Sequence, residues 1–233
     1  MAKSKIIKDL ANGTIDTATA LKRTKVLLSE LNDSQLLHWV NCELTGYSDD
    51  EELPDYRVVY GQLVGSYFKG SMTRYMQWTN VSLPLGNMPE ELQEALLSIR
   101  LSEGVSALQN LSKQYESNDS NFGKVVPADL FPYIAKWNND LGMIITSARV
   151  IAGKQCLDTV FSAVESRLLD VLLLLEREFG ILDDLDIDTS SKSCDEMGKI
   201  SEQLHQIIFN DYSISIGDGN KIKGTSILSG QSD

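Results

Sequence analysis

Apolar positions follow a helical period through the first 45 residues of the chain. Three helices are predicted there, over residues 4–12, 17–31 and 34–44. Asp16 or Thr17 supplies the N-cap of the second helix, and the Asn32-Asp33-Ser34 segment ends that helix and caps the third. Gly13 and Gly46 follow the first and third helices, where glycine readily takes the backbone conformation that ends a helix.

The period changes from helical to alternating after an acidic run at residues 49–52. Residues 56–67 and 75–83 are rich in Tyr, Val, Trp and Thr, and Lys69-Gly70-Ser71 separates them. This pattern predicts a β-hairpin or small sheet inserted between helices at about residues 56–84.

Helical spacing returns in most of the remaining chain. A helix is predicted over residues 90–111, and a short strand or a docked turn near residues 125–134. Residues 141–179 contain the most apolar stretch, which is typical of a helix surrounded by others in a bundle. An acidic linker at residues 183–188 then precedes a last helix over about residues 195–209.

The C-terminal tail alternates again around a glycine-rich turn. Ile214, Ile216 and Ile222 fall on one face of a predicted two-stranded ribbon, and Asp218-Gly219 suits the tight turn between its strands. A lone ribbon is only marginally stable, so it must dock on the bundle, add to the inserted hairpin or pair with another chain. We expect the three isoleucines to make contacts between chains or with a partner, with simple docking as the alternative.

These patterns predict a mainly α fold: a helical bundle with an inserted β-hairpin or small sheet and a C-terminal β-ribbon. The expected organisation is a helical domain over residues 1–180, an acidic linker and helix over 181–211, and the ribbon tail over 212–233.

Composition is ordinary for a soluble globular protein, and the N-terminus shows no signal-peptide pattern, so a cytoplasmic location is expected. Of 233 residues, 42% are apolar, and 33 acidic against 21 basic side chains give a net charge of −12. This charge repels a phosphate backbone on average, so binding to nucleic acid would need a segregated basic patch. The candidates for such a patch are Lys3, Lys5, Lys8, Lys22, Arg23 and Lys25. The longest strongly apolar run, residues 171–175, is too short for a bilayer, so no membrane partner is expected.

The metal-binding patterns of the sequence are incomplete. The three cysteines are far apart and form no CxxC pair, which argues against a disulfide framework and a structural zinc site. His38 and Cys42 share a helix face at i and i+4, but no third ligand lies nearby in the sequence. Residues 184–188 begin like an EF-hand loop, yet Thr189 and Asp195 stand where that loop needs glycine and glutamate. We therefore predict no metal site and no cofactor.

No catalytic residues are predicted either, which favours a non-enzymatic protein. Residues 219–225 lack the lysine placement and the following helix of a phosphate-binding P-loop. The acidic residues near the late apolar helix do not show the pattern of a metal-dependent nuclease. Arg167 lies beside the apolar stripe of this helix and needs a partner, for which Glu43 and Glu165 are candidates.

The most distinctive block spans residues 21–57, where a basic, leucine-rich helix leads through a second helix and the acidic run to a Leu-Pro-Asp-Tyr-Arg segment. Its order resembles the AbiTii domain of bacterial proteins associated with abortive infection, a defence against phage. The resemblance continues more loosely to about residue 180. It implies an antiviral setting and assigns no catalytic residues. The motif positions expected to have structural roles are Trp39, Gly46, Tyr47, Pro54, Tyr56 and Arg57.

The motif has a physical interpretation of its own as a corner of the fold. Trp39 and Tyr47 would pack against the strand that begins at Tyr56. Pro54 would end the acidic loop, and Arg57 would pair with Asp55 or Glu52.

The leading functional hypothesis is a non-enzymatic antiphage component that acts as a sensor or scaffold, by forming homo-oligomers or by binding a companion defence protein. One alternative is a toxin or effector that acts on nucleic acid through the basic N-terminal helices. Another is an antitoxin-like inhibitor whose acidic surface mimics nucleic acid or covers a basic toxin. The binding hypothesis depends on His38 and His205 not joining several carboxylates in one deep cleft.

Overall fold

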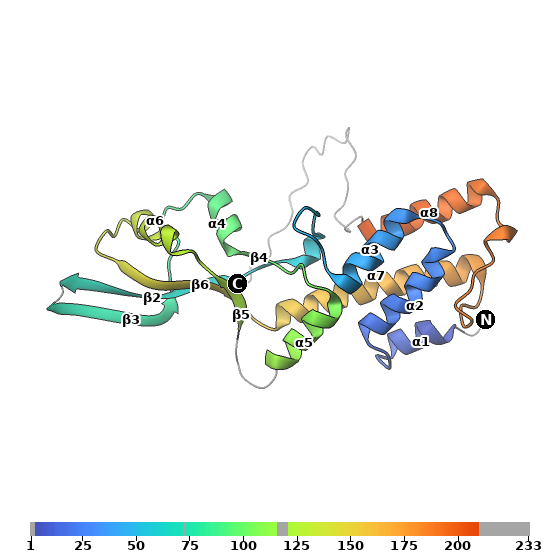
Figure 1. Cartoon of the computed structure of the whole chain (residues 1–233), viewed down its shortest axis with the longest axis horizontal. Coiled ribbons are helices and arrows are strands. Elements are labelled where there is room, and N and C mark those ends of the chain that lie inside the picture. Colours follow the sequence, from blue (N-terminus) through green and yellow to red (C-terminus); the bar gives the residue numbers. More distant parts are fainter. Residues whose placement is uncertain (1–2, 72, 116–120, 210–233) are drawn as a thin grey trace, which may run out of the picture.

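The chain is elongated, with helices gathered at one end and a sheet at the other (Figure 1). This computed structural model describes residues 3–71, 73–115 and 121–209. Helices α1, α2, α3, α7 and α8 form the helical end, whereas α4 and α6 lie beside the sheet. The described helices are α1 (Lys5–Ala11), α2 (Thr17–Ser29), α3 (Ser34–Thr45), α4 (Glu90–Leu97), α5 (Val105–Tyr115), α6 (Phe131–Trp137), α7 (Gln155–Phe179) and α8 (Cys194–Phe209), with 3₁₀ turns η1 (Asp55–Arg57), η2 (Ala128–Leu130) and η3 (Thr189–Ser191).

The strands form two antiparallel sheets within the described part of the chain. In the smaller sheet, β1 (Val58–Tyr60) pairs with β4 (Ser98–Arg100). The larger sheet has the order β3-β2-β6-β5. Its strands are β2 (Gln62–Ser71), β3 (Arg74–Ser82), β5 (Phe122–Val125) and β6 (Ile144–Ala152).

The expectation of a helical bundle with a small β insert is therefore wrong, and the fold is mixed α/β. The expected hairpin exists as β2 and β3, but β6 extends it on the other side of β2. β6 lies within the segment 141–179, whose strong helical pattern comes from α7 alone. β4 likewise divides the helix predicted over residues 90–111 into α4 and α5. Both strands pair with partners far away in the sequence, which local periodicity does not reveal.

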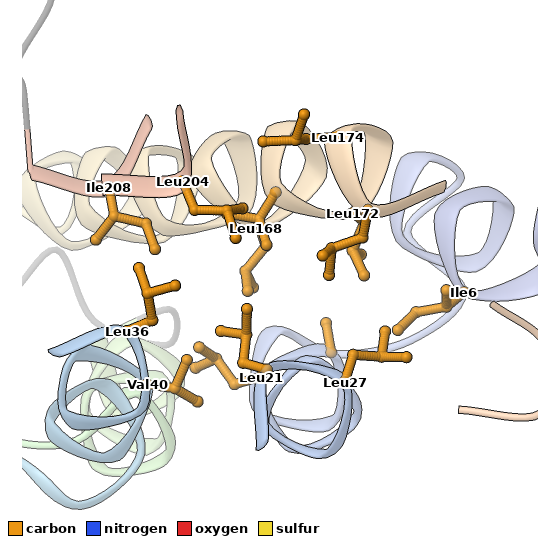
Figure 2. Close-up of a cluster of buried hydrophobic side chains, with 14 of the residues drawn as sticks. Ile6, Leu21, Leu27, Leu36, Val40, Leu168, Leu172, Leu174, Leu204 and Ile208 are labelled. Atoms are coloured by element: carbon orange, nitrogen blue, oxygen red, sulfur yellow. The ribbon is translucent and has the colours of Figure 1, made fainter. Parts of the chain in front are cut away.

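Helical spacing along α7 builds the first core. Leu168 and Leu172 of α7, one turn apart, point toward Leu21 and Leu27 of α2, and all four side chains are fully buried (Figure 2). Complete burial of one leucine side chain contributes about 1.5–3 kcal/mol. Leu204 of α8 belongs to the same cluster, so the predicted last helix packs into the helical end.

Side-chain caps begin α2 and α3, as the sequence predicts. Asp16 accepts a hydrogen bond from the backbone N–H of Thr19 at 2.7 Å. Asp33 accepts from the backbone N–H groups of Gln35 and Leu36 at 3.0 and 3.2 Å. Each cap satisfies a donor that the helix itself leaves unpaired and stabilises it by about 1 kcal/mol.

A second core lies beneath the larger sheet. Buried residues of β2 and β6 pack there against α6 and the first turns of α7. Tyr56 and Phe161 pack against both cores. Because Tyr56 lies in η1, directly before β1, the helical end and the sheet end of the molecule meet at this residue.

The N-terminal segment is tied to the far end of α7. Glu176 accepts hydrogen bonds from Lys3 Nζ and from the backbone N–H and hydroxyl of Ser4, each at 2.6 Å. Burial opposes the charged carboxylate, but these donors outweigh it and lower the pKa of Glu176 to about 2. Asp183 accepts from the backbone N–H of Lys5 at 2.5 Å, so the acidic linker helps to position α1.

The remaining expectations concern membrane-spanning helices and the C-terminal ribbon. None of the helices that the structure describes is both long enough and apolar enough to cross a membrane. The tail with Ile214, Ile216 and Ile222 lies outside the described residues, so the ribbon and its contacts stay a prediction.

Candidate functional site

A fully buried ion pair lies where the two ends of the molecule meet. The carboxylate of Glu43 in α3 bonds the Arg57 guanidinium in η1, and neither side chain is exposed to solvent. The remaining guanidinium donors bond the backbone carbonyls of Leu101 at 3.0 Å and Glu103 at 2.6 Å. Arg57 therefore does not pair with Asp55 or Glu52 but joins α3 to the segment that follows β4.

Three aromatic side chains of the motif complete the hydrogen bonding around Glu43. The hydroxyls of Tyr47 and Tyr56 each donate to Glu43 Oε1 at 2.7 Å, and Trp39 Nε1 donates to the Tyr56 hydroxyl at 3.1 Å. Burial and the negative charge of Glu43 raise the pKa of both tyrosines above the ordinary value. The tyrosines stay neutral and act as fixed donors, which a buried carboxylate requires.

Gly46 allows α3 to end against the segment that follows β4. Its backbone has φ of 102°, and the next residue, Tyr47, donates its N–H to the Ser102 carbonyl at 2.7 Å. A Cβ atom at Gly46 would lie only 2.8 Å from the Ser102 oxygen. Conformation and close approach both favour glycine here, which confirms Gly46 as the end of the helix.

Gly46→Ala should destabilise the protein more than Gly13→Ala does. Gly13 also has positive φ, at 65°, but nothing lies within 4 Å of the Cβ it would gain. Backbone strain of this kind costs about 1–3 kcal/mol, and Gly46→Ala adds the displacement of Ser102. Thermal and urea unfolding of both variants measure the difference. Equal losses would show that the contact with Ser102 relaxes without cost.

Arg167 of α7 reaches the same corner from the opposite side. Its guanidinium carbon lies 4.3 Å from the centre of the Tyr56 ring. Its Nε donates to the Ile208 carbonyl and its Nη1 to the Ala163 carbonyl, both at 3.3 Å. Arg167 thus covers one face of Tyr56 and reaches the end of α8. The sequence predicts an ion pair of Arg167 with Glu43 or Glu165, but Glu43 pairs with Arg57 and Glu165 accepts from the Thr17 hydroxyl.

A surface cleft of about 770 Å³ opens beside this corner. Its walls come from α3, Tyr47, residues 51–56, Arg167 of α7 and the end of α8. Aromatic side chains and acidic side chains share the lining. The aromatic ones are Trp39, Tyr47, Tyr56 and Phe209, and the acidic ones are Glu51, Glu52 and Asp55.

His38 and Cys42 also line the cleft, and the fold brings Glu51 to them. His38 therefore joins carboxylates in one cleft, which the binding hypothesis requires it not to do, so that hypothesis now depends on the geometry of this cluster. Glu51 Oε1 lies 2.8 Å from His38 Nε2 and 3.5 Å from Cys42 Sγ, and the sulfur is 3.4 Å from Nε2. The loop after α3 therefore supplies the third potential metal ligand, which is missing near His38 and Cys42 in the sequence. In the sequence, Glu51 is recognisable only as a member of the acidic run at residues 49–52, which is predicted to be solvent-exposed.

The cluster does not have the geometry of an activated thiol. In a nucleophile–base–carboxylate relay, sulfur and carboxylate approach different nitrogens of the imidazole, but here both approach Nε2. Burial and the charge of Glu51 raise the pKa of Cys42 to about 11, the opposite of an activated cysteine. Three potential ligand atoms instead point toward one another.

The other histidine forms a clamp between α8 and α3. His205 Nε2 lies 2.8 Å from Asp33 Oδ2, and the hydroxyl of Ser201 donates to the same oxygen. Burial opposes the charged carboxylate, but these contacts and the cap to Leu36 together lower the pKa of Asp33. Because serine and histidine both contact the aspartate rather than each other, this trio lacks a serine–base pair.

The basic N-terminal patch is partly neutralised. Lys3 pairs with Glu176 at 2.6 Å, and Arg23 pairs with Asp9 at 3.4 Å. These contacts reduce the positive charge that the first two helices offer to a phosphate backbone.

The motif residues form one connected structure around Glu43, which the sequence predicts only as a candidate partner of Arg167 and which the structure pairs with Arg57. Trp39, Tyr47 and Tyr56 surround Glu43, whose place on the buried face of α3 was a usable signal. A charged residue four positions after buried Trp39 needs a buried partner.

Comparison with known proteins gives a family and no closer relative. The AbiTii family profile matches residues 4–197, which include α3, the loop with Glu51 and the Glu43–Arg57 pair. No curated protein and no solved structure matches the chain. Since the match covers well over half of its length, the chain belongs to the AbiTii family, whose name refers to abortive infection.

Proposed function

We propose that this AbiTii protein is a non-enzymatic component of phage defence that senses or scaffolds by binding a companion protein in the cleft beside α3. The observation that carries the proposal is the coincidence of the cleft with the family motif. Trp39, Tyr47, Pro54 and Tyr56 all line it. The polar groups of Trp39, Tyr47 and Tyr56 are held in a part-buried hydrogen-bond network, which orders these side chains before a partner binds.

The chemistry of the cleft favours a segment with both basic and apolar side chains. Glu52 and Asp55 are exposed on its lining, while the half-buried rings of Tyr47 and Tyr56 supply the type of surface that dominates protein interfaces. The net charge of −12 would speed association with a basic partner. Such a partner would differ from nucleic acid, which the same charges repel.

The position of the cleft supports a sensing role. Tyr56 lines the cleft and also packs against both cores of the molecule. A partner that binds one arrangement of this corner more tightly than another would shift the relation between the helical end and the sheet. Binding is thereby linked to a change elsewhere in the protein.

Reversing two of the acidic charges that line the cleft should strongly reduce protection. In cells that carry the protein with its neighbouring genes, we expect Glu52→Lys with Asp55→Lys to reduce protection against a restricted phage by about ten-fold or more, because like charges repel a basic partner. Efficiency of plating measures the effect, after immunoblots confirm equal protein levels.

A matched control comes from the same acidic run. Asp49 and Asp50 are exposed but do not line the cleft. Asp49→Lys with Asp50→Lys makes the same change in net charge and should leave protection intact. Equal loss in both double variants, or loss in neither, would contradict binding at the cleft.

A further inference from the structure

Three side chains of different chemistry meet at the rim of the cleft. His38 and Cys42 lie one turn apart on α3, and Glu51 reaches them from the loop that follows. Cys42 Sγ lies 3.4 Å from His38 Nε2 and 3.5 Å from Glu51 Oε1, and Nε2 lies 2.8 Å from Oε1. An imidazole, a thiol and a carboxylate at such distances have the donor set of a zinc site.

We propose that His38, Cys42 and Glu51 bind one Zn²⁺ ion through Nε2, Sγ and Oε1. Zinc lies about 2.0–2.3 Å from such ligands, so tetrahedral coordination separates nitrogen from oxygen by roughly 3.3 Å and sulfur from either one by roughly 3.5–3.6 Å. The two distances from sulfur, 3.4 and 3.5 Å, are already close to these values. Only the distance between His38 Nε2 and Glu51 Oε1 must widen, from 2.8 Å. It widens because the direct contact between these two atoms is replaced by a bond from each atom to the metal.

The loop holds the carboxylate ready for this role. The backbone N–H of Ser48 donates to Glu51 Oε2 at 2.6 Å, which leaves Oε1 directed at His38 and Cys42. A hydrogen bond that orients a ligand from outside is a regular feature of metal sites. The backbone N–H of Glu51 also donates to the Ser48 carbonyl, so two hydrogen bonds join Ser48 and Glu51 across the turn.

The donor set selects the class of ion. Thiolate and imidazole prefer zinc and related transition metals, whereas Mg²⁺ and Ca²⁺ require oxygen ligands. Binding releases one proton, from the Cys42 thiol to solvent, and forms the bond between thiolate and metal. Because all three side chains line the cleft, water or a ligand can reach the fourth position.

The site is independent of the proposed companion, so it is tested on the isolated, untagged full-length chain. After treatment with a chelator, the protein is titrated with Zn²⁺ by calorimetry and with Co²⁺ by absorption spectroscopy. We expect one ion per chain and a near-ultraviolet band from thiolate-to-cobalt charge transfer. Loss of an outer hydrogen bond already weakens metal sites by about 10–100-fold, so loss of a direct ligand should weaken Zn²⁺ binding at least that much.

Substitutions assign the ligands. Cys42→Ser should abolish the cobalt band, and His38→Asn and Glu51→Gln, which change side chains nearer the surface, should each weaken Zn²⁺ binding. Cys156→Ser and Cys194→Ser remove the other two cysteines and should change neither measurement. Circular dichroism checks that every variant folds. Absence of the band in the natural protein, its loss with Cys156 or Cys194, or unchanged affinity in any one ligand variant would overturn the three-ligand site.

Discussion

Glu43→Gln should destabilise the protein by about 3–5 kcal/mol, the typical cost of breaking a buried ion pair by removal of one charge. Glutamine has nearly the same size, so the loss does not come from a cavity. It comes from the Arg57 guanidinium, which stays buried and charged with only neutral acceptors, the two backbone carbonyls and the glutamine amide oxygen. Tyr47 and Tyr56 would also lose the charged oxygen to which they donate. Urea unfolding at neutral pH, followed by tryptophan fluorescence and circular dichroism, measures the change.

Two comparisons make this result specific to the buried pair. Glu43→Leu combined with Arg57→Met removes both charges and should cost less than the sum of its single substitutions, because neither partner is left alone. Glu178→Gln weakens the partly exposed contacts of Glu178 with Arg177 and Lys192 and should cost no more than about 1 kcal/mol. A Glu43→Gln loss as small as this would mean that water enters the corner and solvates Arg57.

Leu168→Ala should cost about 2–5 kcal/mol. Leu168 is fully buried at the middle of α7 and faces α2 (Figure 2). Its truncation removes apolar contacts and leaves a cavity that neighbours on α2, α3 and α8 fill only in part. Leu92→Ala is the same chemical change on α4, where the side chain is 47% exposed. It should stay within about 0.5 kcal/mol of the natural protein.

The comparison also tests whether the two ends unfold together. If they form one cooperative unit, Leu168→Ala lowers the midpoint for signals from helices and from the aromatic residues of the sheet alike. Separate midpoints would show that the second core survives without the first, and that the corner at Tyr56 couples them weakly. A loss equal to that of Leu92→Ala would contradict the burial of Leu168.

The helices of the first 45 residues and the last helix could be predicted because their signals are local. Their apolar positions recur every three to four residues, and Asp16 and Asp33 cap the helix that follows each of them. The hairpin of β2 and β3 was accessible for the same reason, since its two strands adjoin in the sequence. β6 could not be predicted, because a strongly helical pattern follows it immediately in the sequence and its partner β2 lies about 80 residues earlier.

The candidate site shows the same limit. The motif residues are recognisable from the sequence. The sequence predicts Asp55 or Glu52 as the partner of Arg57, whereas in the folded chain its partner is Glu43. Metal binding at His38 and Cys42 was set aside for want of a third ligand, and the fold brings Glu51 within 2.8 Å of His38. Both contacts depend on how the loop after α3 turns back across that helix.

The sequence by itself determined the family, the three N-terminal helices, α7, α8 and the six motif positions of the corner, because each depends on residue types that lie close together along the chain. Tertiary structure decided the four-stranded sheet, the partner of Arg57, the cleft and the meeting of His38, Cys42 and Glu51. These features join residues through space, and the free energy that selects them comes from burial and charge pairing. That energy exists only once the chain is folded.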